Sequence, residues 1–275
     1  MKKLLLFIFI PQLLFSQYNT QELFLYGEAA LNGKDCKSAI KYLSEYLSIN
    51  TNDNIAFEMR GRAYELCGDY EKALGDFSNS IFINSRYDKA FLSRGKLYIK
   101  LKEYDNAIAD FNNVLIINPR DSEAYLQKGI SCYHIDNFSL AISNLSNAIN
   151  IAPYYSEAYR YRGIIYYKLG NKEEAIKDLN RAIEVDKNNY NAYMDRGSLF
   201  FIEEKYTEAL KEYNLAFSIK ETEPDLFVRR GYTYKALEKY SQALTDFNTA
   251  CKLDNSYCSY LENEIKQLEI LIKSN

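Results

Sequence analysis

The sequence is poor in the residues that build most catalytic centres. Its 275 residues include one histidine, five cysteines, four prolines and no tryptophan. A single histidine excludes most metal sites and catalytic triads, and no Cys-x-x-Cys pair or Cys/His spacing suited to zinc is present. The eleven glycines are isolated rather than clustered, so a glycine-rich phosphate loop is also lacking. We therefore expect no enzyme activity, no metal and no cofactor.

The sequence also lacks an excess of positive charge. It has 34 lysines and arginines against 37 acidic residues, a formal net charge of −3 and a pI of about 5.5. A nucleic-acid surface would need a basic patch. We therefore expect no nucleic-acid partner.

The sequence contains a repeat with a period of 34 residues. A glycine recurs at Gly27, Gly61, Gly95, Gly129, Gly163, Gly197 and Gly231. An alanine follows each of these glycines by twelve residues, at Ala39, Ala73, Ala107, Ala141, Ala175, Ala209 and Ala243. Two residue types held at one period over seven copies indicate a stacked array.

Each repeat has the pattern of a helical hairpin, most clearly in residues 88–121. Apolar or small residues at i, i+4 and i+7 define one helix face in each half, and they are Phe91, Gly95, Tyr98 and then Ala107, Phe111, Val114. The polar residues 102–105 between the halves predict the turn. A glycine inside a helix costs about 1 kcal/mol relative to alanine. We therefore expect it to allow a close approach to the alanine of the second helix.

This unit resembles the tetratricopeptide repeat. The family pattern of large, small and aromatic positions followed by proline is matched at Phe91, Gly95, Tyr98, Ala107, Phe111, Val114 and Pro119. The resemblance covers residues 20–257. It implies an all-α, right-handed superhelical solenoid of seven 34-residue helix-turn-helix repeats that acts as a non-enzymatic protein-interaction scaffold.

The repeat period divides the chain into segments. The seven repeats are predicted at residues 20–53, 54–87, 88–121, 122–155, 156–189, 190–223 and 224–257, within a solenoid of residues 17–257. Residues 258–275 predict a final helix with an apolar stripe of Leu261, Ile265, Leu268 and Ile272. We interpret it as a cap that closes the end of the stack.

Residues 1–16 have the pattern of a secretory signal peptide. Lys2 and Lys3 precede the mostly apolar residues 4–15, and Ser16 offers a small residue at a cleavage site. We therefore expect an exported protein, periplasmic or secreted, without a stable membrane span after signal removal. The alternative is an uncleaved segment that anchors the N-terminus in the membrane.

Charges recur at two positions of the repeat. Six copies have a cation before the glycine, namely Arg60, Arg94, Lys128, Arg162, Arg196 and Arg230. Sixteen residues later stand Asp76, Asp110, Asn144, Asp178, Glu212 and Asp246. In the fourth copy the cation is Lys128 instead of arginine, and the later position holds Asn144 instead of an acid. The first copy has Tyr26 and Tyr42 at these two positions. Such paired changes predict contact across the hairpin, with a structural role.

In an exported chain the cysteines can form disulfides. In an antiparallel stack, the start of one repeat's second helix lies beside the end of the next repeat's first helix. We therefore predict bridges Cys36–Cys67 and Cys251–Cys258, with Cys132 as a buried free thiol. The alternative is that all five cysteines are unpaired.

The resemblance also implies a peptide-binding groove on the inner wall, formed by the first helix of each repeat. Its predicted residues are Leu92, Lys96, Ile99, Lys100, Leu126, Ile130, Tyr133, His134, Arg160, Ile164, Tyr167, Lys168, Met194 and Phe201, and the same face continues at Ser198, Tyr232 and Lys235. Exposed apolar area of this extent marks an interaction site. We expect a peptide or other apolar protein segment with some acidic character. The alternative is that the apolar residues pack between neighbouring helices.

Several other functions stay open. The family's two-carboxylate clamp needs Lys and Asn at set groove positions, which here mostly hold apolar or acidic residues, so this function is not transferred. His134 is interpreted as a solvated or packing residue. The alternatives to a peptide-binding scaffold are a binder of glycans or small molecules of the cell envelope, and a purely structural assembly module.

Overall fold

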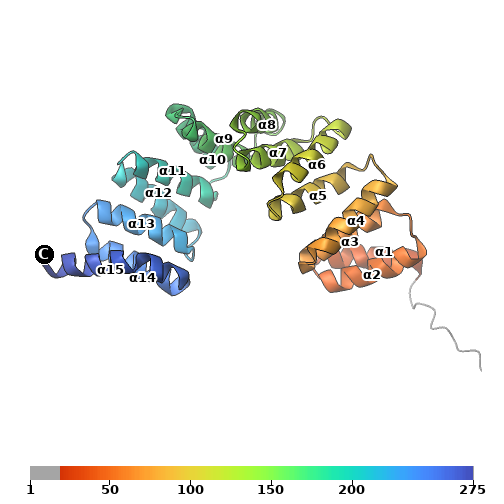
Figure 1. Cartoon of the computed structure of the whole chain (residues 1–275), viewed down its shortest axis with the longest axis horizontal. Helices are drawn as coiled ribbons and strands as arrows, with labels where there is room; N and C mark the ends of the chain where they lie inside the picture. Colours follow the sequence, from red (N-terminus) through yellow and green to blue (C-terminus); the bar gives the residue numbers. More distant parts are fainter. Residues whose placement is uncertain (1–18, 275) are drawn as a thin grey trace, which may run out of the picture. The chain divides into compact units, whose positions relative to one another are not determined.

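The structure, a computed structural model, describes residues 19–274, and in that range it is all-helical, with fifteen α-helices in helix-turn-helix pairs and no strand (Figure 1). The predicted signal peptide, residues 1–16, lies outside the described residues. The all-α hairpin array is therefore confirmed, while its right-handed twist and the count of seven repeats stay predictions. No helix in residues 19–274 has the length and apolarity to cross a membrane.

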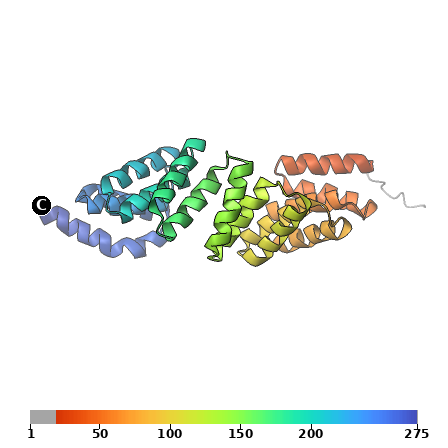
Figure 2. The same ribbon diagram turned by 90° about the horizontal axis from the view of Figure 1, so that it is seen from above.

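The chain forms two compact units, which we describe separately. The first unit ends at Pro119. It contains α1 (Thr20–Asn32), α2 (Cys36–Ile49), α3 (Asn54–Cys67), α4 (Tyr70–Ile83), α5 (Asp88–Lys100) and α6 (Tyr104–Ile117). Figure 2 shows these helices following one another as antiparallel pairs.

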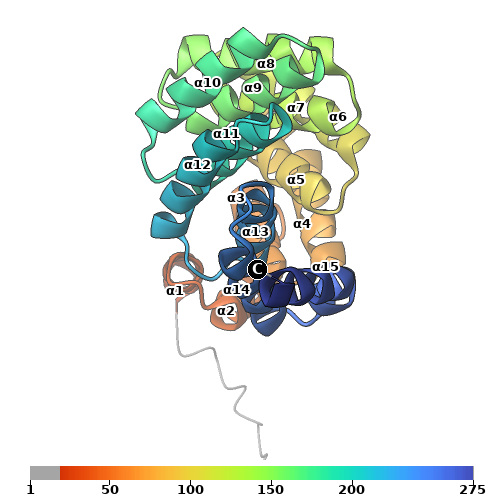
Figure 3. The ribbon, with the colours of Figure 1, turned by 90° about the vertical axis from the view of Figure 1, so that its left-hand side faces the viewer.

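The second unit begins at Arg120. It contains α7 (Ser122–His134), α8 (Phe138–Ile151), α9 (Ser156–Lys168), α10 (Lys172–Val185), α11 (Tyr190–Ile202), α12 (Tyr206–Ile219), α13 (Pro224–Ala236), α14 (Tyr240–Leu253) and α15 (Ser256–Ser274). The final helix α15 begins two residues before the predicted start of the cap. It packs beside α14 (Figure 3), burying Leu261 and Leu268, while Lys235 of α13 pairs with its Glu264.

Local sequence sets where these helices start and turn. At the start of α3, the Asp53 side chain accepts hydrogen bonds from the backbone N–H groups of Ile55 and Ala56, at 2.9 and 3.1 Å. Such a cap satisfies donors that have no partner within the helix. The turn inside each hairpin uses a residue with positive φ, again at the 34-residue period: Lys34, Gly68, Lys102, Asp136, Gly170, Glu204 and Glu238.

The repeated glycines allow close helix approach, mainly to the large residue sixteen positions later. A β-carbon at Gly95 would lie 2.7 Å from Cε1 of the Phe111 ring, and one at Gly61 would lie 2.7 Å from Phe77. The predicted approach to the alanine of the second helix is present in two repeats. A β-carbon at Gly61 would lie 3.3 Å from the Ala73 carbonyl oxygen, and one at Gly163 would lie 3.1 Å from that of Ala175.

The predicted charge pairs are present. Arg162 donates from Nε and Nη2 to both carboxylate oxygens of Asp178, at 2.7 and 2.9 Å, and equivalent pairs form at Arg60–Asp76, Arg94–Asp110 and Arg230–Asp246. Arg196 donates only from Nη2 to Glu212, at 2.6 Å, and its buried Nε has no hydrogen-bond partner within residues 19–274. In the fourth repeat, Asn144 instead donates to the Leu140 carbonyl at 2.7 Å. The Tyr26 and Tyr42 rings lie 5.6 Å apart, so contact across the hairpin is confirmed there too.

Each of the five arginines makes a further contact that was not predicted. Its Nη1 group donates to a polar side chain sixteen residues earlier, on the second helix of the preceding repeat. In this way Arg162 reaches Ser146 at 2.9 Å and Arg230 reaches Asn214 at 3.1 Å. One arginine therefore fixes a hairpin internally and also links it to its neighbour.

One of the two predicted disulfides is present. Cys36 at the start of α2 is bonded to Cys67 at the end of α3, with 5.7 Å between Cα atoms, and Cys132 is a buried free thiol as expected. The bridge Cys251–Cys258 is not formed. Helix α15 begins at Ser256, so Cys258 is its third residue rather than its first. The two thiols meet instead as a hydrogen-bonded pair, and burial and this bond raise the pKa of Cys251 to about 11.

Candidate functional site

In the first unit, the predicted groove residues lie on α5. Leu92 and Ile99 are half-buried, whereas Lys96 and Lys100 are exposed. Lys100 lies 3.8 Å from the Glu65 carboxylate of α3, and its ammonium group is 4.8 Å from the centre of the Tyr70 ring.

Four of the predicted groove residues in the second unit are buried, so the expectation of exposed anchors does not hold for them. They are Leu126, Ile130, Arg160 and Met194. Met194 packs in a core cluster with Tyr193 and Tyr213, and Arg160 donates to Asp195 at 2.9 Å. These side chains face the neighbouring helix instead of an open groove.

Tyr133, His134 and Lys168 form a small cluster at the ends of α7 and α9. The Lys168 ammonium lies 5.0 Å from the centre of the Tyr133 ring, and the His134 ring lies 5.2 Å from it. Burial and the nearby Lys168 lower the pKa of His134, which favours its neutral form.

The remaining predicted residues of the second unit, Ile164, Tyr167 and Phe201, line two adjacent pockets. The larger, of about 250 Å³, is lined by Ser198, Phe201, Ile202, Tyr213, Arg229 and Tyr232. The smaller, of about 120 Å³, is lined by Ile164, Tyr167, Asp195, Ser198, Leu199 and Ile202. Both share Ser198 and Ile202, so together they form one depression over α9, α11 and α13, which we call the second-unit groove.

Apolar side chains form the walls of the second-unit groove. Phe201 packs edge-on against Tyr206, with ring centres 5.3 Å apart, which fixes the aromatic wall. Ile202 is 62% exposed although it is a large aliphatic residue. The groove therefore leaves apolar area in contact with water, and covering it would be favourable by about 25 cal/mol for each Å².

Two charged side chains stand at the edges of the groove. On the larger pocket, Arg229 donates to Asp225 and to the Ser198 hydroxyl, each at 2.7 Å. On the smaller pocket, burial raises the pKa of Asp195, and its ion pair with Arg160 acts in the opposite direction. The groove thus has a cation at one pocket and a carboxylate at the other.

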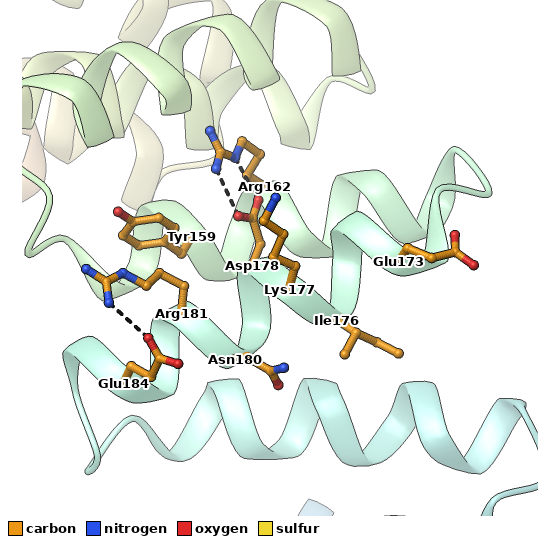
Figure 4. A pocket seen from close by; sticks show the side chains of 9 residues that line it. All are labelled: Tyr159, Arg162, Glu173, Ile176, Lys177, Asp178, Asn180, Arg181 and Glu184. Carbon is orange, nitrogen blue, oxygen red and sulfur yellow. Dashed lines mark hydrogen bonds and ion pairs between the residues drawn. The ribbon is translucent and has the colours of Figure 1, made fainter.

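A larger depression of about 670 Å³ lies along α10 (Figure 4). Four of its charged side chains already pair with one another. Arg162 binds Asp178, and Arg181 lies 2.9 Å from Glu184. A ligand there would have to replace contacts within the protein, so we prefer the second-unit groove as the candidate site.

Sequence reasoning missed part of the inner wall. It did not single out Asp195, Leu199, Ile202 or Arg229, and it did not recognise that neighbouring first helices are joined by residues 35 apart. Examples are Ser93 with Glu58 at 2.8 Å and Arg160 with Asp195 at 2.9 Å. Polar pairs at a separation of 35 residues were the sequence signal that could have indicated these contacts.

Within residues 19–274, no group of three or more His, Cys, Asp or Glu side chains is placed to hold a metal ion.

Comparison with known proteins identifies the repeat. Family models described as tetratricopeptide repeat match residues 88–121, 156–189 and 224–257. The repeat unit of this chain is therefore the tetratricopeptide repeat, and the chain is a tetratricopeptide-repeat protein. No curated protein matches the sequence.

Solved structures share this fold at low sequence identity. A tetratricopeptide repeat protein from Parabacteroides merdae is 22% identical, with a TM-score of 0.72 over 90% of this chain and 96% of that one. The protein pilF of Pseudomonas aeruginosa is 16% identical, with a TM-score of 0.66 over 78% and 97%. MamA of Desulfovibrio magneticus is 19% identical, with a TM-score of 0.58 over 62% and 96%. At these identities the likeness concerns the fold.

Proposed function

We propose that this protein is an exported protein–protein interaction scaffold that binds a peptide segment of a partner in the second-unit groove. The tetratricopeptide repeats support a scaffold role. The observation that carries the proposal is the pair of adjacent apolar pockets, which share Ser198 and Ile202. A partner's apolar side chains would cover the exposed face of Ile202.

The repeats themselves are well fitted to hold such a groove rigid. Each of the three hairpins that form the groove is fixed by an arginine–carboxylate pair, and α9, α11 and α13 are joined by polar contacts between neighbouring first helices. A preorganised groove loses little conformational entropy when a ligand binds. This rigidity favours recognition of a short segment over a folding-upon-binding mechanism.

Export is the second part of the proposal. The Cys36–Cys67 disulfide supports an oxidising compartment, because structural disulfides are rare in the cytosol. Together with the basic and apolar pattern of residues 1–16, it favours a periplasmic or secreted protein. N-terminal anchoring to a membrane is the alternative.

A photo-crosslinking experiment in the native host tests the binding role. A photoreactive phenylalanine analogue replaces Tyr167 at the groove, and the matched control places it at the exposed Lys177 of α10. We expect one dominant protein adduct from Tyr167, none from Lys177, and loss of the adduct when Ile202→Ser is added. An adduct that forms equally from both positions, or that survives Ile202→Ser, would contradict groove binding.

The same variants separate the other candidate functions. A rise in melting temperature with envelope glycans, abolished by Ile202→Ser and without a protein adduct, would make the groove a glycan site. Concentration-dependent oligomers in sedimentation, unaffected by Ile202→Ser, would indicate an assembly module. Mass measurement of the exported chain reports whether residues 1–16 are removed.

A further inference from the structure

The second-unit groove has a regular geometry that constrains what it can bind. Its two pockets lie on either side of α11, one toward α9 and the other toward α13. Packed helices are about 8–10 Å apart, so the two pockets are separated by about one helix spacing. A ligand that fills both must present two side chains on one face at that separation.

The groove is narrower at its two flanks than at its centre. Helix α9 contributes Ile164 and Tyr167, and α13 contributes Arg229 and Tyr232, so each flanking helix provides about one turn, a rise of about 5.4 Å. Helix α11 lines the centre over about two turns, from Asp195 to Ile202. A ligand that crosses all three helices has to pass over the two narrow flanks, which favours an extended segment.

Extended backbones differ in where they place their side chains. In a β-strand, side chains on one face recur about every 7 Å, and this spacing is shorter than the pocket separation. A polyproline II segment has three residues per turn and rises about 3.1 Å per residue, so residues i and i+3 share a face at about 9 Å. We propose that the groove selects a polyproline-II-like segment with two apolar side chains three residues apart. This inference rests on the proposed function.

The two pockets differ in size. Their volumes of about 250 and 120 Å³ favour an aromatic side chain in the larger pocket and a short aliphatic one, such as valine, in the smaller. The aromatic walls of Phe201, Tyr213 and Tyr232 suit edge-to-face contact with an aromatic anchor.

The charge at the larger pocket points to one flanking group. The Nε and Nη1 groups of Arg229 are occupied by Asp225 and Ser198, while its Nη2 group makes no hydrogen bond within residues 19–274. A carboxylate next to the aromatic anchor can accept from that group. The recognised segment therefore carries an acidic residue beside its aromatic residue.

Fluorescence anisotropy with labelled peptides and the full chain tests this inference. The probes are ten-residue peptides of Ser and Pro with Asp before Phe, and with Val at two, three or four residues from Phe, in both orders. We expect a peptide with the three-residue spacing to bind at least tenfold tighter than those with two or four. Ile202→Ser should remove this preference, while Leu215→Ser, at an exposed apolar residue of α12, should retain it.

The outcomes distinguish this inference from the function on which it rests. Equal affinity for all three spacings would overturn the spacing rule. Failure of every peptide to bind would also overturn it, even if the Tyr167 crosslink captures one partner in an Ile202-dependent way, and the proposed function would then stand without the rule. Loss of both the peptide binding and the Ile202-dependent crosslink would overturn both.

Discussion

Removal of Arg162 should destabilise its repeat far more than removal of a surface cation. The guanidinium makes two hydrogen bonds to Asp178 of α10 and a third to Ser146 of α8. It thus connects three helices, two within its own hairpin and one in the preceding repeat. Arg162→Ala breaks all three connections at once.

The expected magnitude follows from burial. The Asp178 side chain is only 6% exposed, and the Arg162 side chain is 18% exposed. Breaking a fully buried ion pair costs about 3–5 kcal/mol because the remaining charge loses its partner. Some water can reach this site, so we expect a loss of about 2–3 kcal/mol in the free energy of unfolding.

The assay has to suit a repeat array. Urea denaturation followed by circular dichroism gives the total loss, and hydrogen exchange of the α9 and α10 amides locates it, because repeat proteins can open locally. The matched control is Lys177→Ala on α10. Lys177 is 76% exposed in its pair with Glu174, so its removal should change stability by less than about 0.5 kcal/mol.

A double-mutant cycle separates pairing from lost packing. Arg162→Ala with Asp178→Ala should cost less than the sum of the single changes by at least about 1 kcal/mol. The fourth repeat already tolerates the loss of the carboxylate, because it has Lys128 with Asn144, whose amide donates to the Leu140 carbonyl. Arg162→Lys with Asp178→Asn should therefore recover part of the loss. An Arg162→Ala protein as stable as the Lys177→Ala control would refute the reasoning.

Three further changes test other parts of the fold by the same denaturation assay. Gly95→Ala should cost about 1–3 kcal/mol because its β-carbon would meet the Phe111 ring, whereas Gly75→Ala, with nothing within 4 Å, should stabilise α4 by about 0.5–1 kcal/mol; equal effects would contradict the close approach. Glu204→Gly should stabilise by up to about 1 kcal/mol because φ is +59° there, and any loss of stability would argue against strain at this turn. Burial raises the pKa of Glu58, so its contribution to stability is present at low pH and lost as the pH rises above 4.5 through that raised pKa; Glu58→Gln should flatten this dependence, and an unchanged pH profile would refute it.

Much of the fold could be predicted because the repeat multiplies each weak signal. A single arginine and aspartate sixteen residues apart would predict little, but their joint replacement in the fourth repeat indicated contact, and the structure has that contact in every charged pair. The hairpin turns were located, yet their left-handed residues were not. Gly68 and Gly170 are of the residue type that indicates positive φ in a sequence. Lys102 and Glu204 also have positive φ, but their residue types give no sign of it.

The groove was predicted less well because exposure on the inner wall depends on contact between neighbouring helices. The position three residues before the repeat glycine was assigned to the groove, but it is buried at Leu126, Arg160 and Met194 and half-buried at Leu92. The position four residues after the glycine, as at Phe201, is half-buried and lines a pocket. Both positions lie on one helix face in sequence, seven residues apart, so periodicity alone does not separate them.

The first and last repeats are stabilised in different ways. Both need extra stabilisation because the repeats of a solenoid contact only their immediate neighbours. A terminal repeat has a neighbour on one side only, so it gains half the interface energy of an internal repeat. The first repeat has Tyr26 and Tyr42 in place of the ion pair, and the Cys36–Cys67 bond joins its second helix to the next repeat. The last repeat is covered by α15, which buries Leu261 and Leu268. A covalent bond and an added helix thus each replace the missing neighbour.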